Sequence, residues 1–290
     1  MNWRRIITRR ESGQKAPRPV YDVLEIPLAS CVHYSGFRYG CHEFNPLENR
    51  ARDLHRGDSF LETRRRFVDF LLYYRPRGMA EALGINLRKH CPLWAYPWWN
   101  VAEDRLSPGF GWFDDSEDVP DVITHFSEAG ILAYRIDQEF FWQEQALWTI
   151  GKHGYRADLY SYIEVCELRR REHPSAFIVM DGNHRISALF ALGHESVRVR
   201  RDKLLVIHED RMNEWPGVKS GRVPPDDAHA IFMAYFQGNS RWRTTDVPAQ
   251  IIGHAGWKEL YLPLSVPHSG PGSSQSPPTT FQPPSSSNKT

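Results

Sequence analysis

The sequence predicts an α+β fold built on a small mixed sheet. Three observations support this class. Short apolar runs are typical of buried strands, and longer stretches carry apolar residues at helical spacing. At residues 176–192, an apolar run passes through a tight polar turn into a helical pattern. The chain has 290 residues, of which 41% are hydrophobic, enough to form a sizeable core.

The first half of the chain is expected to open with a strand over 20–28, where apolar and polar residues alternate up to Pro27. A helix is expected over 60–83, and Pro76 should break it because proline cannot continue a helical hydrogen-bond ladder. Two further stretches with helical spacing predict helices over 119–129 and 136–152.

The second half is expected to alternate between helices and short strands. Leu159, Ile163 and Cys166 recur at helical spacing, and three arginines follow them, which favours a helix with a basic last turn. The expected elements are a helix over 157–172, a strand over 176–180, a helix to Leu192, strands over 197–200 and 204–208, and a helix over 225–236.

Composition divides the chain unevenly. Residues 1–19 are predicted to be a flexible basic arm, residues 20–263 a single domain, and the Pro/Ser-rich residues 264–290 a disordered tail. A net charge of +1 does not suggest an obligate DNA binder, and a local basic patch that contacts nucleic acid stays open. No apolar run reaches about 18 residues, so no membrane span is expected. Four scattered cysteines favour a reducing, cytoplasmic setting.

Two local clusters allow both a structural and a functional interpretation. Cys31, His33, Cys41 and His42 lie close in sequence, but their spacing fits no common zinc pattern, so structural roles are favoured and no metal ligand is assigned. The Trp-rich segment 91–113 is expected to pack as a core edge. The alternative for that segment is an aromatic wall for a flat ligand.

The run Asp181-Gly182-Asn183-His184-Arg185 is the strongest functional signal. A strand, a glycine-containing turn and a helix start together form a local phosphate-binding geometry, because free amides and the helix dipole favour an anion. Arg185 adds a planar, permanently charged fork.

This run resembles the signature of the ParB/sulfiredoxin superfamily, in which such a turn holds nucleotide phosphates. The resemblance covers about 50 residues, from 157 to 208. It implies a ParB/sulfiredoxin-like small mixed sheet with helices, in which residues 45–150 would be a helical and Trp-rich insertion. Asn183 stands where sulfiredoxins have their cysteine, and His184 where partition proteins have arginine. The pattern fits best a branch that resembles free-amino-acid kinases.

The resemblance therefore implies a nucleotide-binding protein, a kinase-like phosphotransferase acting on a small hydroxylated or sugar-like acceptor. ATP or another nucleotide and Mg²⁺ would be its cofactors. Asp181 and His184 would be catalytic, while Gly182, Asn183, His184 and Arg185 would hold the nucleotide. The alternative is a ParB-like nucleic-acid-binding or regulatory module, or a nuclease, without kinase activity.

Each motif residue also has a structural interpretation. Asp181 could cap the following helix, and Arg185 could pair with an acidic neighbour. His184 could be a histidine at the start of the helix whose hydrogen bonds are satisfied within the fold. No general base is assigned among its candidates, which are Glu25, Glu43, Glu48, Asp114 and Asp115. The triplets Arg64–Arg66 and Arg169–Arg171 are interpreted as solvated helix faces.

Overall fold

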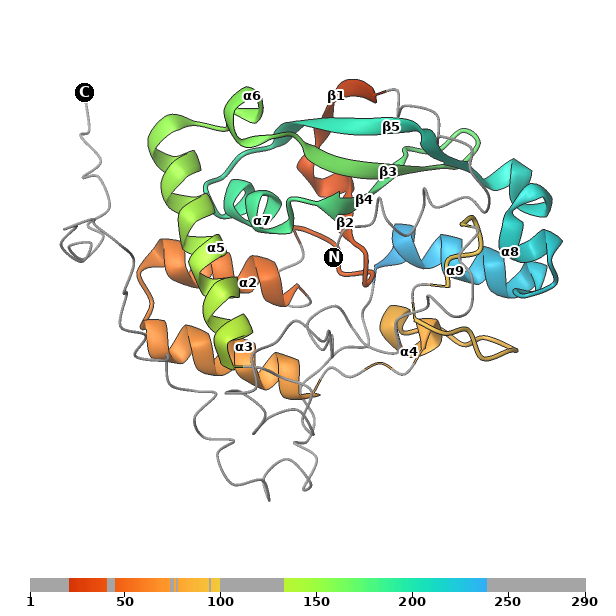
Figure 1. The fold of residues 1–290 in the computed structure, drawn as a ribbon, viewed down its shortest axis with the longest axis horizontal. Coiled ribbons are helices and arrows are strands. Elements are labelled where there is room, and N and C mark those ends of the chain that lie inside the picture. The colour runs from red at the N-terminus through yellow and green to blue at the C-terminus, as the bar shows by residue number, and fades with distance from the viewer. Residues whose placement is uncertain are drawn as a thin grey trace, which may run out of the picture.

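The computed structural model describes residues 21–40, 45–73, 76, 78–93, 95–99 and 133–238. Within these residues the fold is a mixed sheet with helices around it, so the α+β class is confirmed (Figure 1). The strands are β1 (Tyr21–Pro27), β2 (Cys31–His33), β3 (Ile163–Arg169), β4 (Ala176–Asp181) and β5 (Ser196–His208). The α-helices are α2 (Pro46–Arg56), α3 (Phe60–Tyr73), α4 (Met79–Leu83), α5 (Ala133–His153), α6 (Ala157–Tyr160), α7 (Asn183–Ala191), α8 (Pro216–Lys219) and α9 (Pro225–Gln237). The 3-10 helices are η1 (Leu28–Ser30) and η4 (Glu209–Glu214).

The strands follow the order β1-β5-β3-β4-β2 across the sheet. β3 lies in the middle, parallel to β5 and antiparallel to β4. β1 closes one edge antiparallel to β5, and β2 closes the other edge parallel to β4. The predicted opening strand and the apolar strand before the motif are therefore both confirmed.

β4 is buried on both of its faces, which explains its unbroken apolar run. Phe177 and Val179 point into one hydrophobic cluster, together with Ile186 and Leu189 of α7. The alternate residue Ile178 points into a second cluster, which α3, α4 and α9 help to form. α7 thus packs under the sheet directly after the strand that feeds it (Figure 1).

The helices expected over 60–83, 136–152 and 225–236 are confirmed. α3 ends at Tyr73 and α4 begins at Met79, on either side of Pro76. α5 covers the predicted helix over 136–152, and α9 covers the one over 225–236. The helix expected over 119–129, the basic arm and the tail lie outside the described residues.

The helix predicted over 157–172 is wrong. α6 spans only Ala157–Tyr160, and residues 163–169 form β3, the central strand. Two acidic residues of β3 pair with arginines within the sheet. Glu164 pairs with Arg200 and Glu167 pairs with Arg201, both on the neighbouring strand β5. Cross-strand pairing of opposite charges thus stabilises a strand whose spacing favours a helix.

The two strands predicted over 197–200 and 204–208 form one strand, β5. Its pairing with β3 shifts between Val165 and Glu167, whose partners are Arg201 and Val206. Extra residues on β5 are accommodated as an irregularity in the ladder, which accounts for the polar interruption in the sequence.

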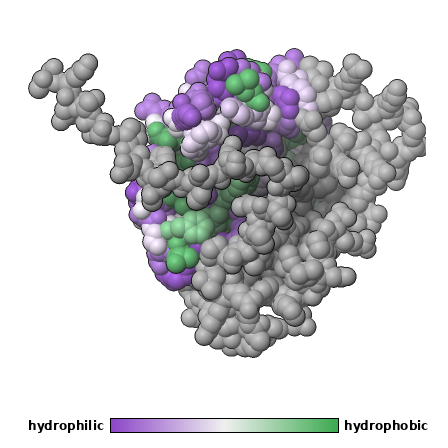
Figure 2. All heavy atoms as spheres, turned by 60° about the vertical axis from the view of Figure 1, so that its left-hand side comes forward, coloured by the Kyte–Doolittle hydropathy of each residue, from purple (hydrophilic) through white to green (hydrophobic). Residues whose placement is uncertain are grey.

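Figure 2 shows apolar side chains exposed on the side of the molecule where α5 and α6 come forward. The large apolar side chains described as exposed on these two helices are Phe141, Trp142, Trp148, Leu159 and Tyr160. Among the described residues, no helix combines the length and apolarity needed to cross a bilayer.

Candidate functional site

The turn between β4 and α7 requires glycine at position 182. Gly182 has a φ of 96°, in the left-handed region. A Cβ there would lie 2.8 Å from Ile163 Cγ1 and 2.9 Å from a guanidinium nitrogen of Arg185. α7 begins at the next residue, and the first amides of a helix lack carbonyl partners within it. The strand, tight turn and helix start expected from the sequence are therefore all present.

Asp181 does not cap α7. Gly182 is the N-cap residue, and no side-chain hydrogen bond caps the helix. The Asp181 side chain is 66% exposed, and its carboxylate accepts a hydrogen bond from Arg185 at 3.1 Å. The structure thus leaves the carboxylate of Asp181 at the surface, beside the start of the helix.

Arg185 and Asn183 fix the turn to its surroundings. Arg185 donates to the backbone carbonyls of Tyr160 and Ser161, at 3.0 and 2.5 Å, in addition to its pair with Asp181. The Asn183 side-chain oxygen accepts a hydrogen bond from the Tyr39 hydroxyl at 2.9 Å. The acidic partner considered for Arg185 is therefore present, and it lies within the motif itself.

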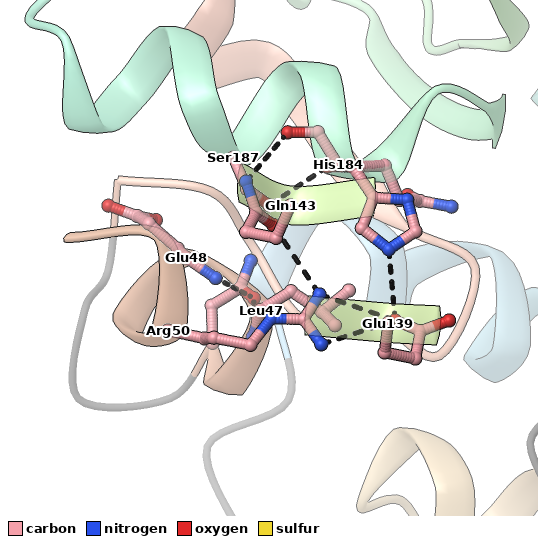
Figure 3. Close-up of polar contacts among 9 residues, drawn as sticks. Leu47, Glu48, Arg50, Glu139, Gln143, His184 and Ser187 are labelled. Atoms are coloured by element: carbon pink, nitrogen blue, oxygen red, sulfur yellow. Dashed lines mark hydrogen bonds and ion pairs between the residues drawn. The ribbon is translucent and has the colours of Figure 1, made fainter. Parts of the chain in front are cut away.

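His184 is held by a carboxylate from a distant helix. Its Nε2 lies 3.0 Å from Glu139 on α5, and the same Glu139 oxygen accepts two hydrogen bonds of 3.2 Å from Arg50 on α2 (Figure 3). Gln143, one helical turn beyond Glu139, donates to the backbone carbonyl of His184 at 3.1 Å. The His184 side chain is 27% exposed, so one ring nitrogen is fixed while the ring still reaches solvent.

The charges around Glu139 keep it ionised. Burial by itself raises the pKa of this carboxyl group, but His184 and Arg50 outweigh the effect of burial and hold the pKa at about 2. The fully buried His33 lies close enough to respond to Glu139 and His184, and burial lowers its pKa to about 3. His33 is therefore neutral near physiological pH, whereas Glu139 carries a negative charge.

Sequence reasoning missed Glu139 and Arg50. They lie 45 and 134 positions before His184, on helices that only the tertiary fold brings to the turn. One signal for them was present in the sequence. Glu139 and Gln143 are spaced i, i+4 and flank the buried Phe140, which places two polar groups on a face of α5 directed inward.

Of the general-base candidates named from the sequence, the two that the structure describes are engaged away from the turn. Glu25 accepts a hydrogen bond from Ser196 at the sheet edge. Glu48 is buried and accepts from the Gly40 amide and from Arg52. Glu43, Asp114 and Asp115 lie outside the described residues. Glu139 is a carboxylate from outside the motif that the described structure places against it, at His184.

The Cys/His cluster is only partly described. Cys31 and His33 are buried in β2, and burial raises the pKa of the Cys31 thiol to about 12. Cys41 and His42 lie outside the described residues. No group of three metal-binding side chains comes together in the part of the chain that the structure describes.

The described tryptophans of the segment 91–113 pack into the core. Trp98 and Trp99 are 5% and 4% exposed. The Trp98 ring packs edge-on against the rings of Trp215 and Phe232, with distances between ring centres of 5.5 and 6.2 Å. These contacts favour the packing interpretation for this pair. Trp94 and residues 100–113 lie outside the described residues.

The arginine triplets are neutralised by carboxylates. Arg64 is buried beneath α5 and lies 2.5 Å from Asp137, so its interpretation as part of a solvated face is wrong. The second triplet begins at Arg169, the last residue of β3, and its other two arginines follow the strand, which corrects the predicted basic last turn of a helix. The other pairs are Arg65 with Glu62 and Asp69, Arg66 with Asp53 and Asp58, Arg169 with Glu167, Arg170 with Glu209, and Arg171 with Glu172.

Comparison with known proteins finds no matching family model, no matching curated protein and no matching solved structure. Functional inference for this chain therefore rests on the geometry of its own residues.

Proposed function

We propose that this chain is a nucleotide-dependent phosphotransferase with a ParB/sulfiredoxin-like fold, acting on a small hydroxylated or sugar-like acceptor. One observation carries the proposal. A carboxylate-held histidine, His184 with Glu139, lies on a glycine turn between a strand and a helix start. Such a turn suits phosphate, and such a histidine suits proton transfer.

The phosphate-binding part of the proposal rests on the start of α7. Gly182 carries no side chain, so a phosphate oxygen can approach the backbone closely. The amides of Asn183, His184 and Arg185 belong to the first turn of α7, where the helix dipole adds partial positive charge. Asp181, exposed beside them, is the carboxylate that would hold Mg²⁺, which supplies charge neutralisation for the phosphates when bound.

The catalytic part rests on the orientation of His184. In the tautomer whose Nε2 carries the proton and donates it to Glu139, the lone pair lies on Nδ1. In the proposed step, Nδ1 takes the proton of the acceptor hydroxyl. The acceptor oxygen bonds to the terminal phosphorus of the nucleotide, and the bond from that phosphorus to the bridging oxygen breaks. Glu139 stabilises the imidazolium that forms, and Arg50 keeps Glu139 in place.

The alternative of a ParB-like nucleic-acid-binding or regulatory module gains no support from the described surface. That alternative drew on the basic stretches of the sequence, and the arginines of both triplets pair with carboxylates. It is retained as an outcome of the test.

The test compares His184→Gln with His229→Gln. His229 also lies 3.0 Å from a carboxylate, Glu209, but on α9, away from the turn, so it is a matched control. Radiolabelled ATP with Mg²⁺ and a panel of polyols and sugars should yield phosphorylated product. His184→Gln should lower the rate by about 100-fold or more, and His229→Gln should leave it unchanged. A thermal-shift panel of ATP, ADP, CTP and GTP should show stabilisation. No response to any nucleotide, together with salt-sensitive binding to DNA or RNA, would overturn the proposal.

A further inference from the structure

A cleft of about 360 Å³ lies between α2 and α3, and none of the residues 181–185 lines it. Arg50 and Thr63 line the cleft from the two helices, and Phe67 supplies part of its apolar wall. Arg50 is also the residue that holds Glu139 against His184, so the cleft and the turn share one side chain.

Arg50, which lines this cleft, carries a buried hydrogen-bond donor without a partner in the described part of the chain. Its two terminal nitrogens bond to Glu139, and one of them also contacts the Gln143 side chain at 3.4 Å (Figure 3). The guanidinium carbon lies 4.2 Å from the centre of the Phe67 ring, which fixes its plane. The Arg50 side chain is 1% exposed, yet its Nε has no hydrogen-bond partner among the described residues.

Thr63 brings a second unused group from the facing helix. It is 1% exposed, and its hydroxyl likewise has no hydrogen-bond partner in the described part of the chain. Buried polar groups are nearly always satisfied, since an unmade hydrogen bond costs stability. These two donors lie on two helices that line the same cleft. A bound group rich in oxygen atoms would satisfy both of them.

The remaining charges at the cleft do not oppose an anion. The two acidic lining residues are already paired, Asp53 with Arg66 and Asp69 with Arg65, each at 3.1 Å. The residues that line the cleft include three arginines and these two aspartates, so positive charges outnumber negative ones. A ligand oxyanion would therefore meet carboxylates that are already paired, beside two buried donors, Arg50 Nε and Thr63 Oγ, that have no partner among the described residues.

We propose that this cleft is a second binding site, which takes a small molecule through a phosphate or carboxylate group held by Arg50 Nε and Thr63 Oγ. Because Arg50 also holds Glu139, and Glu139 holds His184, occupation of the cleft is transmitted to the turn. Binding in the cleft does not depend on the proposed phosphotransferase activity. Only the inference that binding in the cleft regulates catalysis rests on that proposed activity.

The experiment titrates inorganic phosphate and, separately, malonate into the wild type and the Thr63→Val, Thr63→Ser and His184→Gln variants. Thr63→Val should melt higher than the wild type without ligand, because it removes an unsatisfied hydroxyl, and should lose the ligand-induced rise in melting temperature. Thr63→Ser should retain that rise, as should the control Thr149→Val on α5. A response to phosphate alone or to malonate alone identifies which anion the cleft takes.

The coupling is read from the NMR resonances of the His184 ring, which should shift with ligand in the wild type but not in Thr63→Val. Loss of the thermal response in His184→Gln with retention in Thr63→Val would place the anion at the turn and overturn the proposal. Absence of any response to either anion would overturn it as well. Neither result depends on phosphoryl transfer. Failure of the cleft proposal can therefore be distinguished from failure of the proposed phosphotransferase function.

Discussion

His184 and Glu139 lie 3.0 Å apart, Nε2 to carboxylate oxygen, although 45 positions separate them in the chain. The contact joins the start of α7 to the first third of α5. Arg50 approaches the same carboxylate from α2, so three helices meet at one acidic group. The site proposed here is therefore a property of the helical packing as much as of the motif.

Replacing Glu139 should change both stability and its pH dependence. The pKa of Glu139 lies at about 2, below its ordinary value of 4.5, because His184 and Arg50 outweigh burial. A lowered pKa contributes stability above pH 4.5 that is lost as the pH falls towards 2. Glu139→Gln should lower the free energy of unfolding at neutral pH by about 3 kcal/mol, since Arg50 stays buried without its anion.

Urea denaturation of Glu139→Gln and the wild type across the acidic range checks this expectation. The difference between the two proteins should shrink as the pH falls through the range in which Glu139 becomes protonated. The exposed Glu195 offers a control, and Glu195→Gln should follow the wild type at every pH. A difference that stays constant with pH would contradict the assigned ion pair.

Two glycines with positive φ should respond differently to alanine. Gly182→Ala places a Cβ 2.8 Å from Ile163 in addition to the strain of a φ of 96°. Gly193 has a φ of 79° but open space around it, so Gly193→Ala carries the backbone strain alone. We expect a loss of about 3 kcal/mol for Gly182→Ala and about 1 kcal/mol for Gly193→Ala, measured by chemical denaturation. Equal losses would show that the packing at Gly182 relaxes freely.

Neighbouring arginines on α3 should differ in their importance for folding. Arg64 is fully buried against Asp137, whereas Arg65 is 54% exposed with its pairs on the surface. Arg64→Met should lower the free energy of unfolding by about 3 kcal/mol, because Asp137 loses the cation packed against it. Arg65→Met should cost less than about 1 kcal/mol. Urea titrations of both variants provide the measurement, and a reversed order would refute the burial assigned to Arg64.

Trp98→Ala should destabilise the fold, because the ring is buried against Trp215 and Phe232. We expect a loss of about 4 kcal/mol in unfolding free energy. Trp148→Ala, at a side chain that is 50% exposed, should cost far less. Near-wild-type stability of Trp98→Ala combined with lost ligand binding would revive the aromatic-wall interpretation. Far-UV circular dichroism during thermal unfolding distinguishes the two results.

Local signals predicted much of the fold correctly. Three features depend only on residues close together in the chain, and the sequence predicted each of them. They are the apolar run of β4, the glycine at 182 and the apolar spacing of α7. The break at Pro76 was readable for the same reason. β3 was mistaken for a helix because its apolar spacing fits both periods. Its charged residues find their partners only on β5.

The sequence by itself determined the α+β class and the turn at 181–185, since a strand, a glycine and a helix start are set by neighbouring residues. Only the tertiary structure decided what surrounds that turn. Glu139 and Arg50 reach His184 because α5 and α2 pack beside α7, and the burial that makes their charges matter exists only in the folded chain. Ion pairs between residues far apart in the sequence form as a consequence of tertiary packing. No local sequence pattern specifies that packing.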